Sequence, residues 1–136
     1  MGKTTEQISY NMRQVKNKDS DLELMLRMAL WKRGLRYRKN VKQIFGHPDI
    51  AFIGKKVAVF CDSEFWHGYD WEHRKNDFKT RQDFWIPKIS RNIQRDLEVN
   101  ERLTNEGWVV LRFWGKDIKS NLMNCVLKIE ECIKNR

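Results

Sequence analysis

The residues best suited to hydrolytic chemistry stand at the ends of two short apolar runs. Asp49 opens the first run, and Cys61 and Asp62 end the second. Gly54-Lys55 between the runs is typical of a hairpin turn, so antiparallel pairing would bring Asp49 beside the end of the second run. Carboxylate oxygens are the ligands that Mg²⁺ prefers, and a bound cation assists phosphodiester hydrolysis. The alternative is that the Pro-Asp dipeptide forms only a turn before a strand.

The tripeptide Phe65-Trp66-His67 comes directly after the second apolar run, in a polar and charged loop. An imidazole titrates near neutrality, so His67 could act as a general base or orient a water molecule. Large aromatic side chains can stack on bases or wedge between them. The alternative is that Phe65 and Trp66 belong to a loop that folds back into the core.

Hydrophobic periodicity predicts the elements that must position these residues. We expect a helix over residues 21–33, β-type runs over 35–38, 49–53 and 57–61, a loop over 62–79, a short helical turn over 81–86, a helix over 87–105, a strand over 108–114 and a final helix over 118–135. Ser20 is the expected N-cap of the first helix, and Gly34 its C-terminal stop. This order predicts a single-domain α/β fold in which helices flank a mixed sheet.

Charge is the first indication of a partner. Lys and Arg total 27 against 18 Asp and Glu, which gives a net charge of +9. A surface this basic attracts polyanions and so favours a nucleic acid, although many small proteins are basic without such a role. Residues 1–19 are polar and basic, with only isolated apolar residues, and we expect them to form an N-terminal arm before a domain over 20–136.

Other features of the sequence exclude classes of protein. No apolar run approaches the roughly 20 residues that cross a membrane, and the start lacks the apolar stretch of a signal peptide. The three cysteines stand at no bridging or metal-ligand spacing, which fits a reducing compartment. We therefore expect a cytoplasmic protein, associated with the nucleoid when it acts on DNA, with no membrane partner. No cofactor-type glycine-rich loop or nucleophile motif favours a small-molecule enzyme.

Several motifs occur in an order that is specific as a set. They are Asn11-Met12-Arg13, Leu22-Glu23, Gly46-His47-Pro48-Asp49, Phe65-Trp66-His67, Asn92-Ile93-Gln94-Arg95-Asp96, Gly107-Trp108-Val109-Val110-Leu111 and Trp114. Together they resemble the very-short-patch-repair (Vsr) mismatch endonucleases, and more broadly the restriction-endonuclease-like fold. The resemblance covers about residues 8–115, although each motif alone is weak.

The resemblance implies a catalytic site. Asp49 matches the family's metal-binding aspartate, and the main-chain carbonyl of Cys61 is the second expected contact with Mg²⁺. His67 matches the general base, Glu23 an acidic residue of the same site, and Asp96 a carboxylate that orients a histidine or holds a water. Glu23 also has the spacing from the N-cap that makes a capping box, and the two roles need not exclude each other.

The resemblance also implies contacts with DNA. In the mismatch enzymes a residue of the N-terminal arm and the loop aromatics wedge into DNA beside the mispair. Met12, Phe65 and Trp66 occupy those places here, and Arg13 and Asn92 lie in the matching motifs.

One part of the family pattern is missing. The best-known members bind a structural zinc through a loop rich in His and Cys and a Cys after the following strand. Those places here read Glu64, Tyr69, Trp71 and Lys116, which leaves no set of four nitrogen or sulfur ligands. We expect no structural zinc, with Tyr69 and Trp71 packing in its place. Asp62 stands where those members have a second histidine, and it could add a carboxylate to the metal site or cap the strand end.

The leading hypothesis is a Mg²⁺-dependent endonuclease that nicks double-stranded DNA at or near a mismatch of the T:G type. One alternative is a sequence-specific restriction or homing-type endonuclease of the same fold. The other is a non-catalytic DNA-binding module, although Glu23, Asp49, His67 and Asp96 are all present. We further expect a monomer that could act with mismatch-repair proteins.

Overall fold

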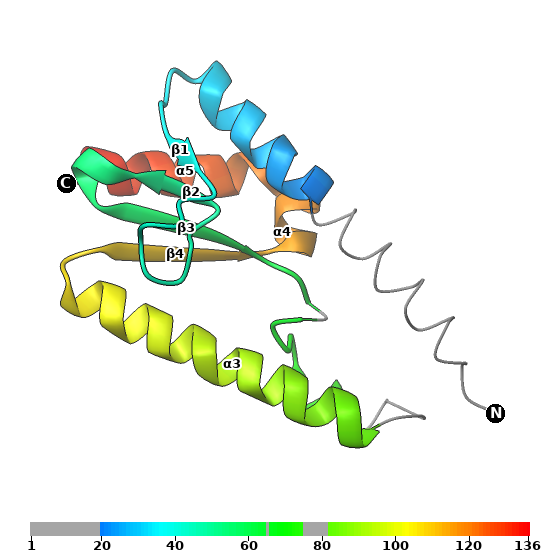
Figure 1. The fold of residues 1–136 in the computed structure, drawn as a ribbon. Coiled ribbons are helices and arrows are strands. Elements are labelled where there is room, and N and C mark those ends of the chain that lie inside the picture. Colours follow the sequence, from blue (N-terminus) through cyan, green and yellow to red (C-terminus); the bar gives the residue numbers. More distant parts are fainter. Residues whose placement is uncertain (1–19, 65, 75–81) are drawn as a thin grey trace.

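The computed structural model describes residues 20–64, 66–74 and 82–136. Its centre is a four-stranded sheet whose strands β1 (Arg38–Lys39), β2 (Ile50–Phe52), β3 (Val57–Asp62) and β4 (Val109–Trp114) lie in that order (Figure 1). A first helix covers residues 20–32. It is followed by the 3-10 turn η1 (Ile53–Lys55) and the helices α2 (Trp71–Arg74), α3 (Gln82–Asn105), α4 (Gly115–Ser120) and α5 (Leu122–Lys134). This is the mixed sheet flanked by helices that the sequence predicts.

The sheet topology brings three strand ends to one edge. β2 pairs antiparallel with β3, with Ile50 opposite Val59. β3 pairs parallel with β4, with Asp62 opposite Trp114, and β1 is antiparallel to β2. Because an antiparallel strand begins where its partner ends, the start of β2 lies beside the carboxyl ends of β3 and β4. Asp49 and Asp62 therefore belong to the same edge.

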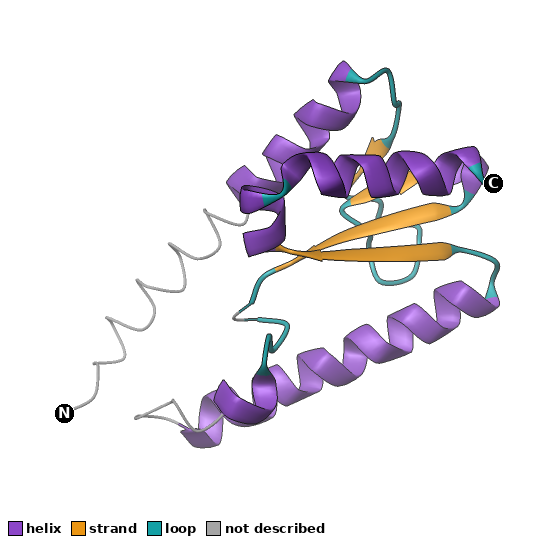
Figure 2. Ribbon diagram, turned by 180° about the vertical axis from the view of Figure 1, so that it is seen from behind, coloured by secondary structure: helices purple, strands orange, loops and turns teal. Residues whose placement is uncertain are grey.

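Helices cover both faces of the sheet, as Figure 2 shows, with α3 on one side and the first helix, α4 and α5 on the other. The larger core cluster joins Leu22, Leu26 and Leu30 of the first helix to strand residues and to Ile118, Val126 and Ile129. The smaller cluster packs α3 on the opposite face through Ala58, Phe60, Val99 and Leu103. β3 is thus buried on both faces, which explains its nearly continuous apolar sequence.

The first helix ends as predicted, but it begins differently. Gly34 has a φ of +83°, and the N–H of Leu35 donates to the carbonyl of Leu30 at 3.1 Å, the geometry of a glycine-terminated helix. Ser20, the predicted N-cap, is itself helical, and the residues before it lie outside the described residues.

Other boundaries correct the predictions. The first strand covers Arg38–Lys39 rather than residues 35–38. Leu35 and Tyr37 instead pack toward the first helix: the side chain of Leu35 joins the core, and the O–H of Tyr37 donates to the carbonyl of Arg27 at 2.9 Å. The expected two-residue turn is the longer η1, closed by Lys56 in the left-handed region with a φ of 54°. The predicted loop contains α2.

The later helices also differ from the prediction. α3 is continuous through the expected short turn, and Pro87 lies inside it rather than in its first turn. The predicted final helix is two helices, because the backbone leaves the helical conformation at Asn121 (φ −133°, ψ 45°). The local pattern alone leaves both boundaries open.

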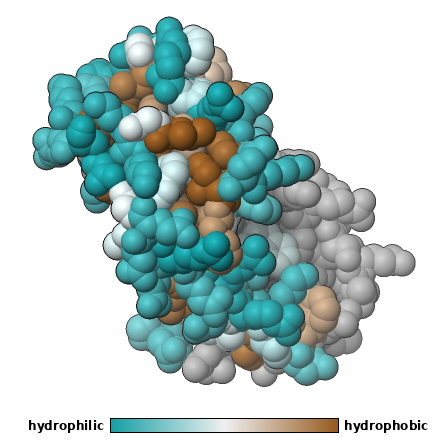
Figure 3. All heavy atoms as spheres, turned by 60° about the vertical axis from the view of Figure 1, so that its left-hand side comes forward, coloured by the Kyte–Doolittle hydropathy of each residue, from teal (hydrophilic) through white to brown (hydrophobic). Residues whose placement is uncertain are grey.

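No helix in the described ranges is long and apolar enough to cross a membrane. Hydrophilic residues cover much of the face in Figure 3, with a band of hydrophobic residues between them.

Candidate active site

Asp49 lies one residue before β2 and is held by its backbone and its side chain. Its carbonyl accepts a hydrogen bond from the N–H of Asn40 at 2.9 Å, and the carbonyl of Pro48 accepts one from Val41 at 3.1 Å. The carboxylate oxygen Oδ2 accepts a hydrogen bond from the N–H of Cys61 at 2.7 Å. The hairpin therefore brings Asp49 beside Cys61, as the sequence predicts.

The loop before Asp49 packs closely against α3. Gly46 has a φ of +85°, and a Cβ atom built on it would lie 2.5 Å from Cγ1 of Val99. Only glycine fits this close approach without a shift of α3. His47 also has a positive φ, of 53°, which is uncommon for a residue with a side chain. The glycine of the Gly-His-Pro-Asp motif thus allows the loop to reach the edge of the sheet.

Asp49 is in an environment that penalises its negative charge. Burial is the largest cause and raises the pKa of Asp49 from 3.8 to about 6. The N–H of Cys61 and the charge of His67 lower this pKa, whereas the nearby carboxylates of Glu23 and Asp62 raise it. The ionised carboxylate therefore needs a compensating positive charge.

Glu23 reaches the same region from the first helix. Its side chain is 17% exposed and lies 3.9 Å from Nε of Arg27. Burial raises the pKa of Glu23, while the charges of Arg27 and Lys39 oppose that shift. The negative charge of Glu23 is one of the causes that raise the pKa of Asp49.

A second group of side chains gathers around His67. Its Nδ1 atom lies 2.5 Å from Oδ2 of Asp96 and 3.8 Å from Oδ1 of Asp62. Burial lowers the pKa of His67, but the hydrogen bond to Asp96 and the charges of both carboxylates outweigh burial and raise it. For Asp62, by contrast, burial is the largest cause and raises the pKa of the carboxyl group. The pairing with Asp96 engages Nδ1 and leaves Nε2 as the ring nitrogen for chemistry.

Arg112 is a member of this group that sequence reasoning missed. Its Nη1 atom donates to both oxygens of Asp62, at 3.1 and 3.2 Å, and lies 3.6 Å from Oδ1 of Asp96. The available signal was a charged residue inside the otherwise apolar run Val109–Trp114. On a strand buried between helices, such a residue needs a partner.

These side chains line one pocket of about 330 Å³. Its lining residues are Gly46, His47, Asp49, Phe60, Cys61, Asp62, His67, Asn92, Arg95, Asp96, Val99 and Arg112. Glu23 is not among them, although its charge contributes to the raised pKa of Asp49.

The Asp49 end of this pocket fits a hard divalent cation. Among the described residues, only the N–H of Cys61 donates to the Asp49 carboxylate, which leaves Oδ1 available as a ligand. The N–H and C=O of one strand residue project toward the same neighbouring strand, so the Cys61 carbonyl faces the Asp49 side. Oxygen donors from Asp49 and the Cys61 carbonyl suit Mg²⁺. The pKa values of Asp49, Glu23 and Asp62 are all raised, so a cation would be favourable here.

Trp66 and Asn92 lie together beside the pocket. Nδ2 of Asn92 donates to the carbonyl of Trp66 at 3.2 Å. The indole of Trp66 is half-buried, 6.0 Å from the ring of Trp85, and Nζ of Lys88 lies 5.2 Å from its centre. Asn92 therefore supports the loop that carries Trp66. The other expected DNA contacts, Met12, Arg13 and Phe65, lie outside the described residues.

The residues at the family's zinc-ligand positions contact one another here through hydrogen bonds and an aromatic contact. Glu64 accepts a hydrogen bond from the N–H of Lys116 at 2.6 Å, and Nζ of Lys116 donates to the hydroxyl of Tyr69. The ring of Tyr69 lies edge-on to Trp114, with centroids 5.1 Å apart. These contacts fasten the loop to the end of β4.

Removal of metal is therefore expected to leave the fold intact. Incubation with a chelator should change neither the circular dichroism spectrum nor Tm relative to the protein as purified without added Mg²⁺, because contacts of Glu64, Tyr69 and Lys116 stand in place of zinc ligands. Elemental analysis is expected to find less than stoichiometric zinc. Unfolding by the chelator would contradict this expectation.

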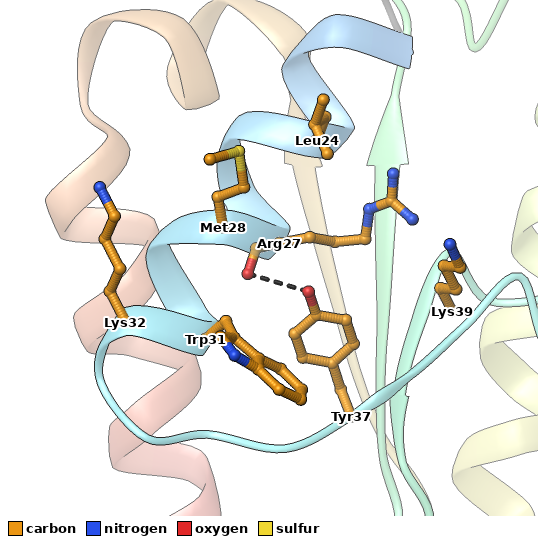
Figure 4. A pocket seen from close by; sticks show the side chains of 7 residues that line it. All are labelled: Leu24, Arg27, Met28, Trp31, Lys32, Tyr37 and Lys39. Atoms are coloured by element: carbon orange, nitrogen blue, oxygen red, sulfur yellow. Dashed lines mark hydrogen bonds between the residues drawn. The ribbon is translucent and has the colours of Figure 1, made fainter.

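A second, more apolar groove of about 460 Å³ lies between the first helix and residues 37–39 (Figure 4). Leu24, Arg27, Met28, Trp31, Lys32, Tyr37 and Lys39 line it. The groove shares no lining residue with the Asp49 pocket, and its described lining includes no carboxylate. It therefore lacks the groups that hydrolysis requires.

Comparison with known families gives one match that agrees with this geometry. The model of the family described as DNA mismatch endonuclease Vsr matches residues 3–73, which include Glu23, Asp49, Asp62 and His67.

Individual relatives extend the similarity over nearly the whole chain. The type II nicking enzyme V.NmeDIP of Neisseria meningitidis serogroup C is 50% identical over 98% of this chain and 90% of its own length. The type II nicking enzyme V.HpaIIP of Haemophilus parainfluenzae is 51% identical over 89% of this chain and 86% of its own length. The DNA mismatch endonuclease Vsr of Escherichia coli is 34% identical over 78% of this chain and 67% of its own length.

Proposed function

This chain belongs to the Vsr family and is a DNA endonuclease, and from that premise we propose that it nicks one strand of duplex DNA at or near a T:G-type mismatch, with Mg²⁺ held at Asp49. The observation that carries this proposal is the half-buried Asp49 carboxylate, whose pKa burial raises to about 6. It shares one pocket with the paired His67 and Asp96, as hydrolysis at a phosphate requires.

Asp49 and the main-chain carbonyl of Cys61 are the groups that would hold the ion. A bound Mg²⁺ would supply positive charge at the scissile phosphate and make water a better nucleophile. The negative charge of Glu23 acts on Asp49 and would strengthen the attraction of that end of the pocket for a cation.

His67 is the proposed general base. Asp96 holds Nδ1 at 2.5 Å, so Nε2 is the nitrogen that takes a proton from water. The raised pKa of His67 makes it a stronger base, while a larger share of it is protonated at neutral pH. Asp96 both orients the ring and stabilises the imidazolium that forms, a division of labour known from other base–carboxylate pairs.

The wedge role proposed for Trp66 and Phe65 accounts for a preference for mispairs. Separating a base step costs a few kcal/mol and costs least where pairing is already faulty. A half-buried indole next to Asn92 of the pocket supports this role, because Asn92 holds the carbonyl of Trp66 at 3.2 Å. Met12 and Arg13 of the basic arm, with Asn92 near the loop, are the other proposed contacts with DNA.

The relatives' names support nicking, and they keep one alternative in view. Two are called type II nicking enzymes and one a DNA mismatch endonuclease. Cleavage of a defined sequence without a mismatch is the corresponding alternative. Three finer points remain predictions: action as a monomer, action in the cytoplasm, and cooperation with mismatch-repair proteins.

A duplex series tests the proposal. Purified protein with Mg²⁺ is incubated with duplexes that carry a T:G pair, another mispair or no mispair, each strand labelled separately. We expect a nick in one strand of the T:G duplex and little cleavage of the perfect duplex. Equal cleavage of mispaired and perfect duplexes would favour the sequence-specific alternative.

Substitution of Trp66 tests the wedge. Trp66→Ala is expected to reduce the preference for the T:G duplex strongly. Replacing a fully buried tryptophan by alanine lowers the free energy of unfolding by roughly 3–5 kcal/mol. Because the indole of Trp66 is half-buried, Trp66→Ala should lower Tm by less than such a loss would. The matched control is Trp31→Ala in the groove of Figure 4, 51% exposed, which should leave the preference unchanged. A core-sized loss of stability in Trp66→Ala would instead assign that residue to packing.

A further inference from the structure

Asp62, His67 and Asp96 have the composition of a second cation site. One possible ligand atom from each lies within 4.8 Å of the others. Yet two of the three side chains already face the guanidinium of Arg112. We propose that Arg112 is a resident cation that takes the place of a second metal ion, so that the site works with one divalent ion, at Asp49.

The guanidinium is fixed from several sides. Its Nη1 atom lies 3.1 and 3.2 Å from the two oxygens of Asp62 and 3.6 Å from Oδ1 of Asp96. Its Nε atom donates to Oδ1 of Asn100 at 2.6 Å, and its Cζ atom lies 4.1 Å from the centre of the Phe60 ring. A side chain held by two carboxylates, an amide and a ring has one position.

Burial makes this pairing necessary rather than incidental. Only 7% of the Asp62 side chain and 17% of the Arg112 side chain are exposed. A buried carboxylate without a partner strongly destabilises the folded state, and arginine keeps its charge at every physiological pH. The positive charge is therefore permanent, and a divalent ion entering the same cluster would meet it at contact distance.

The pairing also makes Arg112 a positioning residue for His67. Asp96 uses Oδ2 for Nδ1 of His67 at 2.5 Å and turns Oδ1 toward Arg112 at 3.6 Å. His67 and Arg112 thus fix the orientation of the Asp96 carboxylate from two sides, and the carboxylate in turn orients the imidazole of His67. This second part of the inference rests on the proposed function, whereas the exclusion of a second ion does not.

Binding of Co²⁺ tests the exclusion, because coordination by histidine gives visible absorption bands. The measurement uses the full chain with Asp49→Asn, which removes the proposed first site. We expect no bound Co²⁺ with Arg112 in place and about one equivalent after Arg112→Gln, lost again when His67→Ala is added. Co²⁺ bound at His67 while Arg112 is present would overturn the inference, as would no binding by a folded Arg112→Gln protein. Failure of the wild type to bind any ion would instead count against the proposed function.

A stability comparison covers the case in which Arg112→Gln folds poorly. Without the guanidinium, the buried charge of Asp62 has no partner, so Tm should fall by roughly 10 °C. Adding Asp62→Asn removes this unpaired charge and should bring Tm most of the way back to the wild-type value. Equal destabilisation of the single and double variants would show that Arg112 serves packing alone and would overturn the inference.

A matched control separates the charge from the stacking. Arg102 lies 4.1 Å from the Phe45 ring and pairs with Glu106 at 3.2 Å, but its side chain is 58% exposed. Arg102→Gln is expected to change neither Co²⁺ binding nor Tm by a measurable amount.

Discussion

Asp49→Asn is expected to abolish DNA cleavage and at the same time to make the metal-free protein more stable. The wild-type carboxylate has a pKa of about 6 against 3.8 when unperturbed, so the folded state holds its proton more tightly than the unfolded state does. Ionisation therefore destabilises the fold as pH rises from about 4 to about 6, and the full cost is present above pH 6. A shift of this size corresponds to about 2–3 kcal/mol.

Asparagine removes the charge and can still accept the hydrogen bond from Cys61. Thermal unfolding at pH 8 should show a higher Tm for Asp49→Asn than for the wild type, and the gain should vanish near pH 4. Addition of Mg²⁺ should raise Tm of the wild type only. Glu131→Gln, which neutralises an exposed carboxylate on α5, is the control and should change neither cleavage nor Tm. Near-normal cleavage by Asp49→Asn would remove Asp49 from the metal site.

His67→Ala is expected to slow cleavage at least ~10²-fold while DNA binding is largely kept, since a general base contributes on that scale. Asp96→Asn should cause a smaller loss, because the imidazole remains but loses its oriented partner. The base acts when it is neutral, so the rate should rise with pH through the pKa of His67, which lies above the ordinary value. Asp96→Asn should move that rise to lower pH.

A second histidine–aspartate pair supplies the control for this prediction. His73 lies 2.7 Å from Asp70, but its side chain is 83% exposed. His73→Ala should therefore leave the cleavage rate and its pH profile unchanged. A pH profile that stays the same in Asp96→Asn would mean that Asp96 does not set the proton affinity of His67.

The fold was largely predictable because the hydrophobic pattern is regular where packing is regular. Leu22, Leu26 and Leu30 recur at helical spacing and are buried together, and the continuous apolar run of β3 is buried on both faces. Boundaries failed where contacts distant in sequence decide them. The hydrogen bond from Tyr37 to the first helix is one such contact, and it is invisible to periodicity.

The candidate site was predictable where a hairpin or an ordered motif defines it. The turn after β2 brings Asp49 beside Cys61. The resemblance to the Vsr family is what pointed to His67 and Asp96, which lie 2.5 Å apart. Arg112 could not be placed, because its role depends on the parallel register that sets Phe60 opposite it and Asp62 two residues further on. Parallel pairing joins segments about 50 residues apart, and single-sequence patterns carry no information on that register.

Cleavage of a T:G-mispaired duplex in the presence and absence of Mg²⁺ tests the central claim most directly. Each strand carries its own label, and the protein is in excess so that a single turnover is followed. The account predicts a nick in one strand with Mg²⁺ and none with a chelator, with Co²⁺ or Mn²⁺ able to replace Mg²⁺. Cleavage that persists in the chelator, or cutting of both strands at equal rates, would contradict it.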